Sequence, residues 1–246
     1  MNPIMRTDVV ESCVLLEHKM DFVANNMANI STYGFKRDDL SFREALVKAS
    51  DGQMKKIKEV TVRTDFSPGD PKSTGNPLDF ALAGPGFFKV QTPDGIRYTR
   101  NGNFCLSGES ILTTPDGYPV LGQGGAITLA GWDVEVNDSG GISIDQSGDG
   151  TMVEADRFDI VDFEDPGALE KMGNSLFRLK DSGATETAAE GVQVRQGALE
   201  FSNVNVVKEM VSMIQLQRNY ESYRKILQFL DEIDARLFNE TGRLTG

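Results

Sequence analysis

The sequence predicts an α+β protein in which the N- and C-terminal helices form one discontinuous helical domain and the middle of the chain forms an all-β domain. Glycine and proline, which interrupt helices, are concentrated in the middle: only four of the 25 glycines and one of the nine prolines lie outside residues 68–197. The chain ends instead repeat apolar residues every three or four positions, whereas the middle alternates short β-rich runs with turn sequences.

The first predicted element is a helix within residues 1–40. Asp8 and Glu11 have the spacing of a capping box, so we expect the helix to begin at Asp8. It should end between Asn29 and Gly34, because asparagine and glycine accept the left-handed backbone that closes a helix. Its apolar residues follow each other at alternating spacings of four and three, the pattern of paired helices. This N-terminal seam consists of Val9, Cys13, Leu16, Met20, Val23, Met27 and Ile30.

Residues 41–66 are predicted to hold a short helix and an extended linker. Ser41 and Glu44 form a second capping-box pattern, which predicts a helix that continues to about Lys48. The remaining residues up to position 66 are polar, which favours a linker or an extended arm.

Residues 67–197 are predicted to form the central β-domain. Short runs rich in β-branched and aromatic residues alternate with turn sequences such as Pro93-Asp94-Gly95. Many short strands with tight turns are typical of a β-sandwich or an open barrel.

Residues 198–246 are predicted to form a second long helix that pairs with the first. It should begin at Asn203 or Asn205, both good N-caps, and continue to about residue 238. Its C-terminal seam consists of Met213, Leu216, Tyr220, Tyr223, Leu227, Leu230 and Leu237. Further apolar residues widen this face: Val207, Val211, Ile214, Ile226 and Ile233. Two helices alone cannot bury so wide a stripe, so we expect it to pack on the β-domain or on other copies.

Composition restricts the partners. The formal net charge of −12 disfavours nucleic acid and anionic membrane surfaces, since both need a basic patch. No run approaches the roughly 18 apolar residues of a membrane-spanning helix. The N-terminal residues have no continuous apolar region of a cleaved signal peptide. Composition alone would therefore favour a cytoplasmic protein.

No catalytic, cofactor or metal site emerges from the sequence. His18 is the only histidine and lies in the first predicted helix, so a solvated or packed side chain is favoured over a catalytic one. Cys13 and Cys105 belong to no metal-binding or disulfide pattern. Residues 145–156 partly mimic a calcium loop, but we interpret them as a polar hairpin turn and keep a calcium-binding β-domain as the alternative function.

Four motifs, in order along the chain, are those of a known family. They are Asn25-Asn26-Met27-Ala28-Asn29 with Gly34-Phe35-Lys36, residues 74–88 (TGNPLDFALAGPGFF), residues 98–104 (YTRNGNF), and residues 196–205 (QGALEFSNVN) with Met213-Ile214 and Gln217-Arg218. In these residues the chain resembles the axial proteins of the bacterial flagellar rod and hook. The C-terminal sequence is most similar to the proximal rod protein, with the distal rod protein as the close alternative.

The resemblance implies a structural subunit of the flagellar basal-body rod, which spans the periplasm, transmits torque and forms the wall of the export channel. Its partners would be other proximal and distal rod subunits and the flagellar type III export apparatus, which would export it without a cleaved signal peptide. This replaces the cytoplasmic interpretation. A hook-type axial subunit remains an alternative. Such proteins pair their terminal helices in antiparallel fashion in the inner tube.

We expect the helical ends to be largely disordered in the monomer and to fold when subunits assemble. The predicted subunit contacts combine seam residues with polar residues of the family motifs. They are Val9, Cys13, Leu16, Met20, Val23, Asn25, Asn26, Met27, Asn29, Ile30, Asn203, Asn205, Met213, Leu216, Gln217, Arg218, Tyr220, Tyr223, Leu227 and Leu230.

Overall fold

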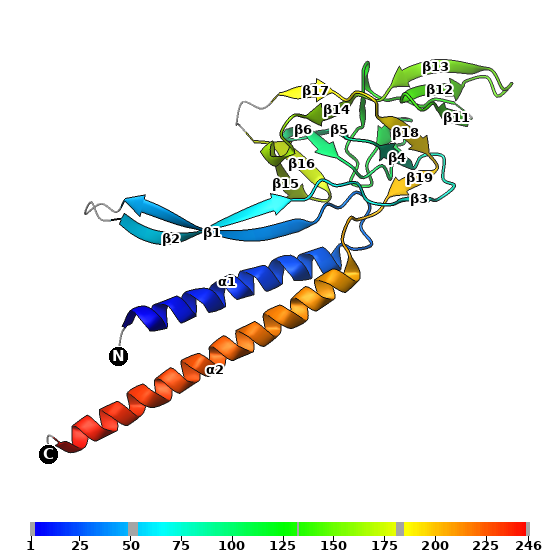
Figure 1. Cartoon of the computed structure of the whole chain (residues 1–246). Helices are drawn as coiled ribbons and strands as arrows, with labels where there is room; N and C mark the ends of the chain where they lie inside the picture. The colour runs from blue at the N-terminus through cyan, green and yellow to red at the C-terminus, as the bar shows by residue number, and fades with distance from the viewer. Residues whose placement is uncertain (1–2, 49–53, 132, 181–184, 245–246) are drawn as a thin grey trace. The chain divides into compact units, whose positions relative to one another are not determined.

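The structure is a computed structural model that describes residues 3–48, 54–131, 133–180 and 185–244 (Figure 1). The chain divides into two compact units. The first unit comprises Met1–Ala28, Asp38–Val62 and Asn205–Gly246, and the second comprises Asn29–Arg37 and Arg63–Val204. Two long helices and a mostly β central region confirm the predicted α+β class. A sandwich or open-barrel arrangement of the strands stays a prediction.

The first unit contains two antiparallel helices, α1 (Pro3–Ala28) and α2 (Val206–Leu244). Their direction follows from contacts at two levels along the pair. Arg6 near the start of α1 lies 2.8 Å from Asp231 of α2, whereas Glu17 further along accepts a 2.6 Å hydrogen bond from Tyr220. Figure 1 shows the two helices side by side within this unit. The pairing expected between the chain ends is therefore present within one chain.

The predicted start of the first helix is wrong by more than a turn. The helix begins at Pro3, which fits the first turn because that position needs no backbone N–H donor. Asp8 lies inside the helix, and its carbonyl accepts the Ser12 hydroxyl one turn later. The end is close to prediction: α1 stops at Ala28, and Gly34 takes a left-handed φ of 66°.

The predicted helix at residues 41–48 is also wrong. These residues belong to β1 (Asp38–Lys48), which pairs with β2 (Met54–Thr64) in a two-stranded sheet that takes the place of the predicted linker. Leu40 is buried within this strand. The capping-box pattern at Ser41 and Glu44 is a local signal, and pairing with the β-branched residues of β2 overrides it.

The start of α2 confirms one of the two predicted caps. The side chain of Asn205 accepts the backbone N–H of Lys208 at 3.0 Å, so Asn205 is the N-cap. The helix continues to Leu244, beyond the predicted end near residue 238. The side chain of Leu237 lies outside the described residues.

The second unit is built around a six-stranded antiparallel sheet with the order β15-β16-β6-β5-β14-β17. Its strands are β15 (Leu169–Gly173), β16 (Leu176–Leu179), β6 (Gly95–Thr99), β5 (Phe87–Thr92), β14 (Ile160–Phe163) and β17 (Glu186–Ala188). A short 3-10 helix, η1 (Pro166–Ala168), precedes β15.

Smaller sheets complete the second unit. A three-stranded sheet has the order β11 (Asp133–Val136), β12 (Gly141–Asp145) and β13 (Met152–Arg157). Four two-stranded pairs are β4 (Phe80–Ala83) with β18 (Gln193–Gln196), β3 (Pro71–Ser73) with β19 (Ala198–Glu200), β7 (Cys105–Leu106) with β8 (Leu112–Thr113), and β9 (Leu121–Gly122) with β10 (Gly125–Ala126).

The core of the second unit lies on both faces of β5. Successive strand residues point to opposite faces, so Phe87 and Phe88 enter two different hydrophobic clusters. Phe88 is fully buried and its ring lies 5.3 Å from the rings of both Phe104 and Phe158. The Gly-Pro-Gly-Phe-Phe sequence thus leads into a strand that is buried on both sides.

Candidate assembly surface

The predicted seams lie largely between α1 and α2 of the same chain. Cys13 and Val23 on α1, and Leu216 and Leu230 on α2, are buried. The other seam residues on the two helices are half-buried, namely Val9, Leu16, Met20, Met27, Met213, Tyr220, Tyr223 and Leu227, as is Ile30 in the turn after α1. Burial and the nearby Glu17 carboxylate raise the pKa of the Cys13 thiol. The structure therefore brings the two seams together as a pair.

A second apolar face of α2 is exposed. Val207 keeps 70% of its surface accessible, and Val211 and Ile214 keep about half. Val207 and the buried Leu216 are nine residues apart, which at 3.6 residues per turn places them on opposite sides of the helix. Two large apolar residues are exposed further along, Ile226 and Phe229. We call Val207, Met210, Val211, Ile214, Ile226 and Phe229 the outer stripe of α2.

The helix α1 contributes a smaller exposed apolar pair. Val10 and Val14 are one turn apart and each keeps more than two fifths of its surface accessible. The predicted contact residues include neither of these nor any member of the outer stripe. The signal was present, because Val207, Val211 and Ile214 recur at helical spacing, but periodicity alone cannot tell which of two apolar faces the partner helix covers.

The predicted contact amides have mostly intrachain roles. The buried Asn26 donates to the carbonyl of Asp38 at 2.8 Å and accepts the N–H of Asp38 at 3.1 Å, so it fixes the start of β1 to α1. Asn29 accepts the Thr32 hydroxyl in the turn after the helix. Asn203 bonds to backbone atoms of the second unit and Asn205 caps α2.

Three further predicted contact residues are exposed. They are Asn25 on α1 and Gln217 and Arg218 on α2. Arg218 lies four residues after Ile214, so it continues the line of the outer stripe.

The 145–156 segment is the turn between β12 and β13 together with β13 itself. The carboxylate of Asp145 accepts backbone N–H groups from Ser147, Gly148 and Gly150 at 2.7–3.1 Å. Asp149 accepts the N–H of Thr151, a bond that lowers the pKa of its carboxyl. Within the described ranges, no three histidine, cysteine or acidic side chains gather where they could hold a metal ion. These carboxylates organise a hairpin turn.

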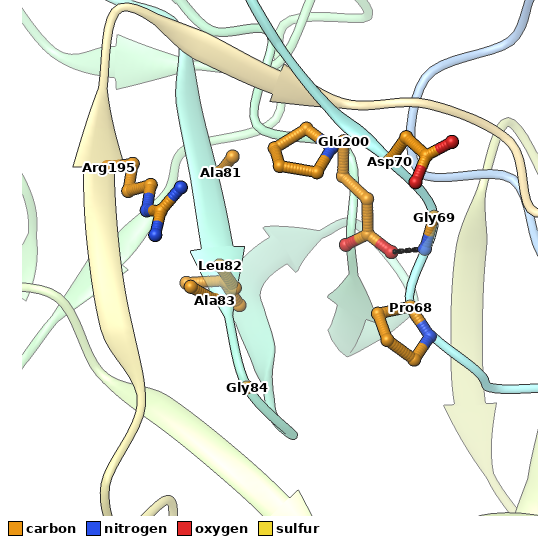
Figure 2. Close-up of a pocket in the computed structure, with 10 residues that line it drawn as sticks. Pro68, Gly69, Asp70, Ala81, Leu82, Ala83, Gly84, Arg195 and Glu200 are labelled. Atoms are coloured by element: carbon orange, nitrogen blue, oxygen red, sulfur yellow. Dashed lines mark hydrogen bonds between the residues drawn. The ribbon is translucent and has the colours of Figure 1, made fainter.

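A pocket of about 360 Å³ lies beside β4 in the second unit. Prolines, glycines and small apolar side chains form most of its wall, and its charged residues are Asp70, Arg195 and Glu200. Figure 2 shows the carboxylate of Glu200 turned to the backbone nitrogen of Gly69, which donates to it at 2.9 Å. Glu200 is therefore engaged in holding the backbone. His18, by contrast, is exposed on α1.

None of the described helices has a stretch both long and apolar enough to cross a membrane.

Two protein-family descriptions and several known proteins match this chain. The family described as "Flagellar basal body rod FlgEFG protein C-terminal" matches residues 195–240, and "Flagellar hook protein FlgE/F/G D1 domain" matches residues 81–156. The flagellar basal-body rod protein FlgF of Caulobacter vibrioides is 35% identical over 93% of this chain and 94% of its own length.

Two other relatives are similar over most of their length. FlgG of Bacillus subtilis is 32% identical over 90% of this chain and 92% of its own length. FlgF of Salmonella typhimurium is 34% identical over 87% of this chain and 88% of its own length. All three are named as basal-body rod proteins, which confirms the prediction of a structural protein rather than an enzyme.

Proposed function

Because this chain belongs to the family of flagellar basal-body rod proteins, we propose that it builds the rod by packing its antiparallel helix pair against the helix pairs of neighbouring subunits. The observation that carries this proposal is the outer stripe of α2. Val207, Val211, Ile214 and Phe229 lie within about 60° of one another around the helix, on the side opposite the buried Leu216. Contiguous apolar residues that are exposed to solvent are typical of interaction sites.

The stripe has enough apolar surface to drive association. Moving one valine or isoleucine side chain fully out of water contributes about 1.5–3 kcal/mol, before the costs of ordering the partners. Val207 keeps 70% of its surface accessible and Val211 and Ile214 keep about half, so a neighbouring helix that covers them gains the corresponding share of this contribution. Asn25, Gln217 and Arg218, which are exposed, would supply polar contacts at its edges.

Packing by neighbouring subunits would also stabilise the seam between α1 and α2. A pair of helices that is covered on only one side is marginally stable in water, because most helical stability comes from tertiary packing. Packing by neighbours would stabilise the seam contacts as well as cover the outer stripe. Assembly would thereby complete the folding of the ends, and torque would pass through packed helices that also form the wall of the export channel.

The proximal rod position is our preferred assignment, with the distal position as the alternative. The C-terminal sequence pattern and the similarity to two FlgF proteins support it, although FlgG proteins match nearly as well. A hook-type subunit is less well supported, because the relatives matched over nearly their whole length are named as rod proteins. As a rod subunit, the chain would reach the periplasm through the flagellar type III apparatus without a cleaved signal peptide.

The test replaces the chromosomal copy in its own bacterium with variants of the outer stripe. Val211→Asp and Ile214→Asp should abolish motility and rod assembly, because a buried carboxylate has no partner in an apolar contact. Asn219→Asp, at an exposed position of the same helix about 120° around it from Val207, should leave both unchanged. Circular dichroism of the purified chains checks that the helix content is equal. Normal rods with both stripe variants would contradict the proposed contact.

A further inference from the structure

The chain enters the second unit at Asn29, leaves it after Arg37, enters it again at Arg63 and leaves it after Val204. Two of the segments at these crossings lie against each other. We call residues 29–37 the incoming segment and residues 198–204 the outgoing segment. Gly34 donates its N–H to the carbonyl of Glu200 at 2.8 Å, and Arg37 donates its N–H to the side chain of Asn203 at the same distance. The two segments are 160 or more residues apart in sequence, yet their backbones are hydrogen-bonded to each other.

A third segment, residues 65–70, bonds to both and is here called the bridging segment. Asp65 donates its N–H to the carbonyl of Arg37 at 2.8 Å. The amide of Asn203 donates to the carbonyls of Asp65 at 2.8 Å and Ser67 at 3.1 Å. The bridging segment therefore holds the incoming and the outgoing segments at once.

Buried charges lie at the centre of these three segments. The side chains of Lys36, Arg100 and Glu200 are each at most 4% exposed. The Lys36 ammonium lies 2.5 Å from one oxygen of Glu200 and also donates to the carbonyl of Ser67. Burial lowers the pKa of Lys36, whereas the charge of Glu200 opposes that shift. The pair is thus desolvated and depends on its own contacts for compensation.

Glu200 has the largest number of roles in this cluster. One oxygen accepts both Lys36 and the N–H of Gly69 in the bridging segment, and the other lies 3.5 Å from Arg100. Its backbone carbonyl accepts Gly34 of the incoming segment. Loss of its charge would leave Lys36 and Arg100 buried without their shared partner, and removing one member of a buried pair is strongly destabilising.

The incoming segment also packs tightly against neighbouring residues of the second unit. A side chain on Gly34 would come within 2.3 Å of the backbone nitrogen of Asn101, and its φ of 66° lies in the left-handed region. The ammonium of Lys171 lies over the ring of Phe35, 4.2 Å from its centre, and donates to the carbonyl of Lys36. The incoming segment is thus packed closely against residues 100–101 and Lys171.

We infer that Glu200 is a positioning residue that, through Lys36 and Gly69, latches the incoming, outgoing and bridging segments together, so that the segments next to the chain crossings of the second unit cannot separate. The purpose of the latch rests on the proposed function, because a rod subunit under torque takes load through these crossings. The latch itself is a property of the single chain. It can therefore fail or hold independently of rod assembly.

The test is hydrogen–deuterium exchange of the purified full chain, read on peptides from the three segments and on peptides from β5 and β6. In Glu200→Gln the amides of the three segments should exchange at least about 100-fold faster, as expected for loss of a buried charge partner. The strands β5 and β6 should change by less than about threefold. The latch would be refuted if amide exchange in Glu200→Gln became equally faster in the strands and in the three segments. It would also be refuted if exchange changed in neither.

The chain offers a matched control in the same unit. Glu186 accepts hydrogen bonds from Lys89 at 3.0 Å and Tyr98 at 2.8 Å, away from the latch. Glu186→Gln makes the same chemical change and should leave the three segments at their original exchange rates. If Glu186→Gln accelerates them as much as Glu200→Gln does, the effect is general loss of stability and the latch is refuted.

A milder variant covers the case in which Glu200→Gln does not fold. Asn203→Asp keeps an acceptor for Arg37 but removes the amide donor to Asp65 and Ser67. It should accelerate exchange by about tenfold in the three segments alone, and unchanged or uniformly faster exchange would refute the latch. Val211→Asp should not alter these amides, so failure of the assembly proposal and failure of the latch give different results.

Discussion

The second unit and the helix pair differ in how much of their apolar surface the chain covers by itself. In the second unit, Phe80, Phe88 and Val90 are completely buried, and two hydrophobic clusters fill both faces of β5. In the helix pair, the most buried apolar residues still keep 7–8% exposure, and Val207 and Phe229 are more than 60% exposed. The second unit therefore has a completely buried core, which we call the finished core. The helix pair leaves one apolar face of α2 exposed.

This difference indicates that the functional surface of this structural protein lies on the helix pair. A finished core stabilises a fold whether or not partners are present. A half-covered helix pair gains stability from whatever covers its other side, and the family to which the chain belongs is one of assembling rod subunits.

The largest effect is expected from the finished core. Phe88→Ala should lower the free energy of unfolding of the second unit by about 3–5 kcal/mol, since it leaves a cavity beside Phe104 and Phe158. Ile96→Ala, at an exposed position on β6, should change it by about 0.5 kcal/mol or less. Chemical denaturation followed by near-ultraviolet circular dichroism measures both. Similar losses would mean that the core is less complete than its burial indicates.

A smaller effect should separate the two faces of α2. Leu216→Ala removes a buried seam contact and should cost about 2 kcal/mol of helix-pair stability in the monomer, whereas Val211→Ala removes an exposed side chain and should cost almost nothing. Thermal loss of the helical signal at 222 nm in the purified chain reports on this. If the two substitutions are equivalent in the monomer, the division into a covered seam and an open stripe is wrong.

The contact between α1 and β1 should give a still smaller loss. Asn26→Ala removes both hydrogen bonds to Asp38 and should destabilise the start of β1 by about 1–1.5 kcal/mol, since water can reach the half-buried Asp38. The amide of Asp38 should then exchange faster in an NMR experiment. The exposed Asn219→Ala on α2 serves as the control, and an unchanged Asp38 amide in Asn26→Ala would contradict the role given to Asn26.

The smallest effect concerns pH at the edge strand β17. Burial raises the pKa of Glu186, but hydrogen bonds from Tyr98 and Lys89 outweigh this and lower it overall. A lowered folded-state pKa stabilises β17 at pH values above the usual glutamate range, and this contribution is lost as the pH falls through the folded pKa. The protection factor of the Thr187 amide, its exchange rate relative to the unstructured rate at the same pH, should therefore fall on acidification below about pH 4.3 in the native chain. Glu186→Gln should remove that dependence, and a persistent dependence would point to another group.

The predictable parts of the fold are those with local signals. The Asn205 cap and the end of α1 near Asn29 follow from residue types within one turn. The strand β1 was not predictable in this way, because the capping-box pattern at Ser41 is local and its partner strand begins at Met54. The role of Asn26 was hidden for the same reason, since its partner Asp38 belongs to that strand.

The latch could not be predicted from one sequence at all. Lys36 and Glu200 are 164 positions apart, and they lie in two different family motifs, neither of which carries a local sign of the other. Half of the candidate surface was predictable: the helical period identified the apolar residues of α2, but it presents the covered and the open faces as one wide face. The burial of Leu216 and the exposure of Val207 were needed to tell them apart.

Hydrogen exchange of the unassembled full chain, compared between the helices and the sheet of the second unit, tests the central claim most directly. If only assembly completes the helix pair, amides of α1 and α2 should exchange at least about 100-fold faster than those of β5 and β14. In assembled rods the helices should become as protected as the strands. Helices that are already as protected as the strands in the monomer would contradict the account, because the pair would then be stable without its neighbours.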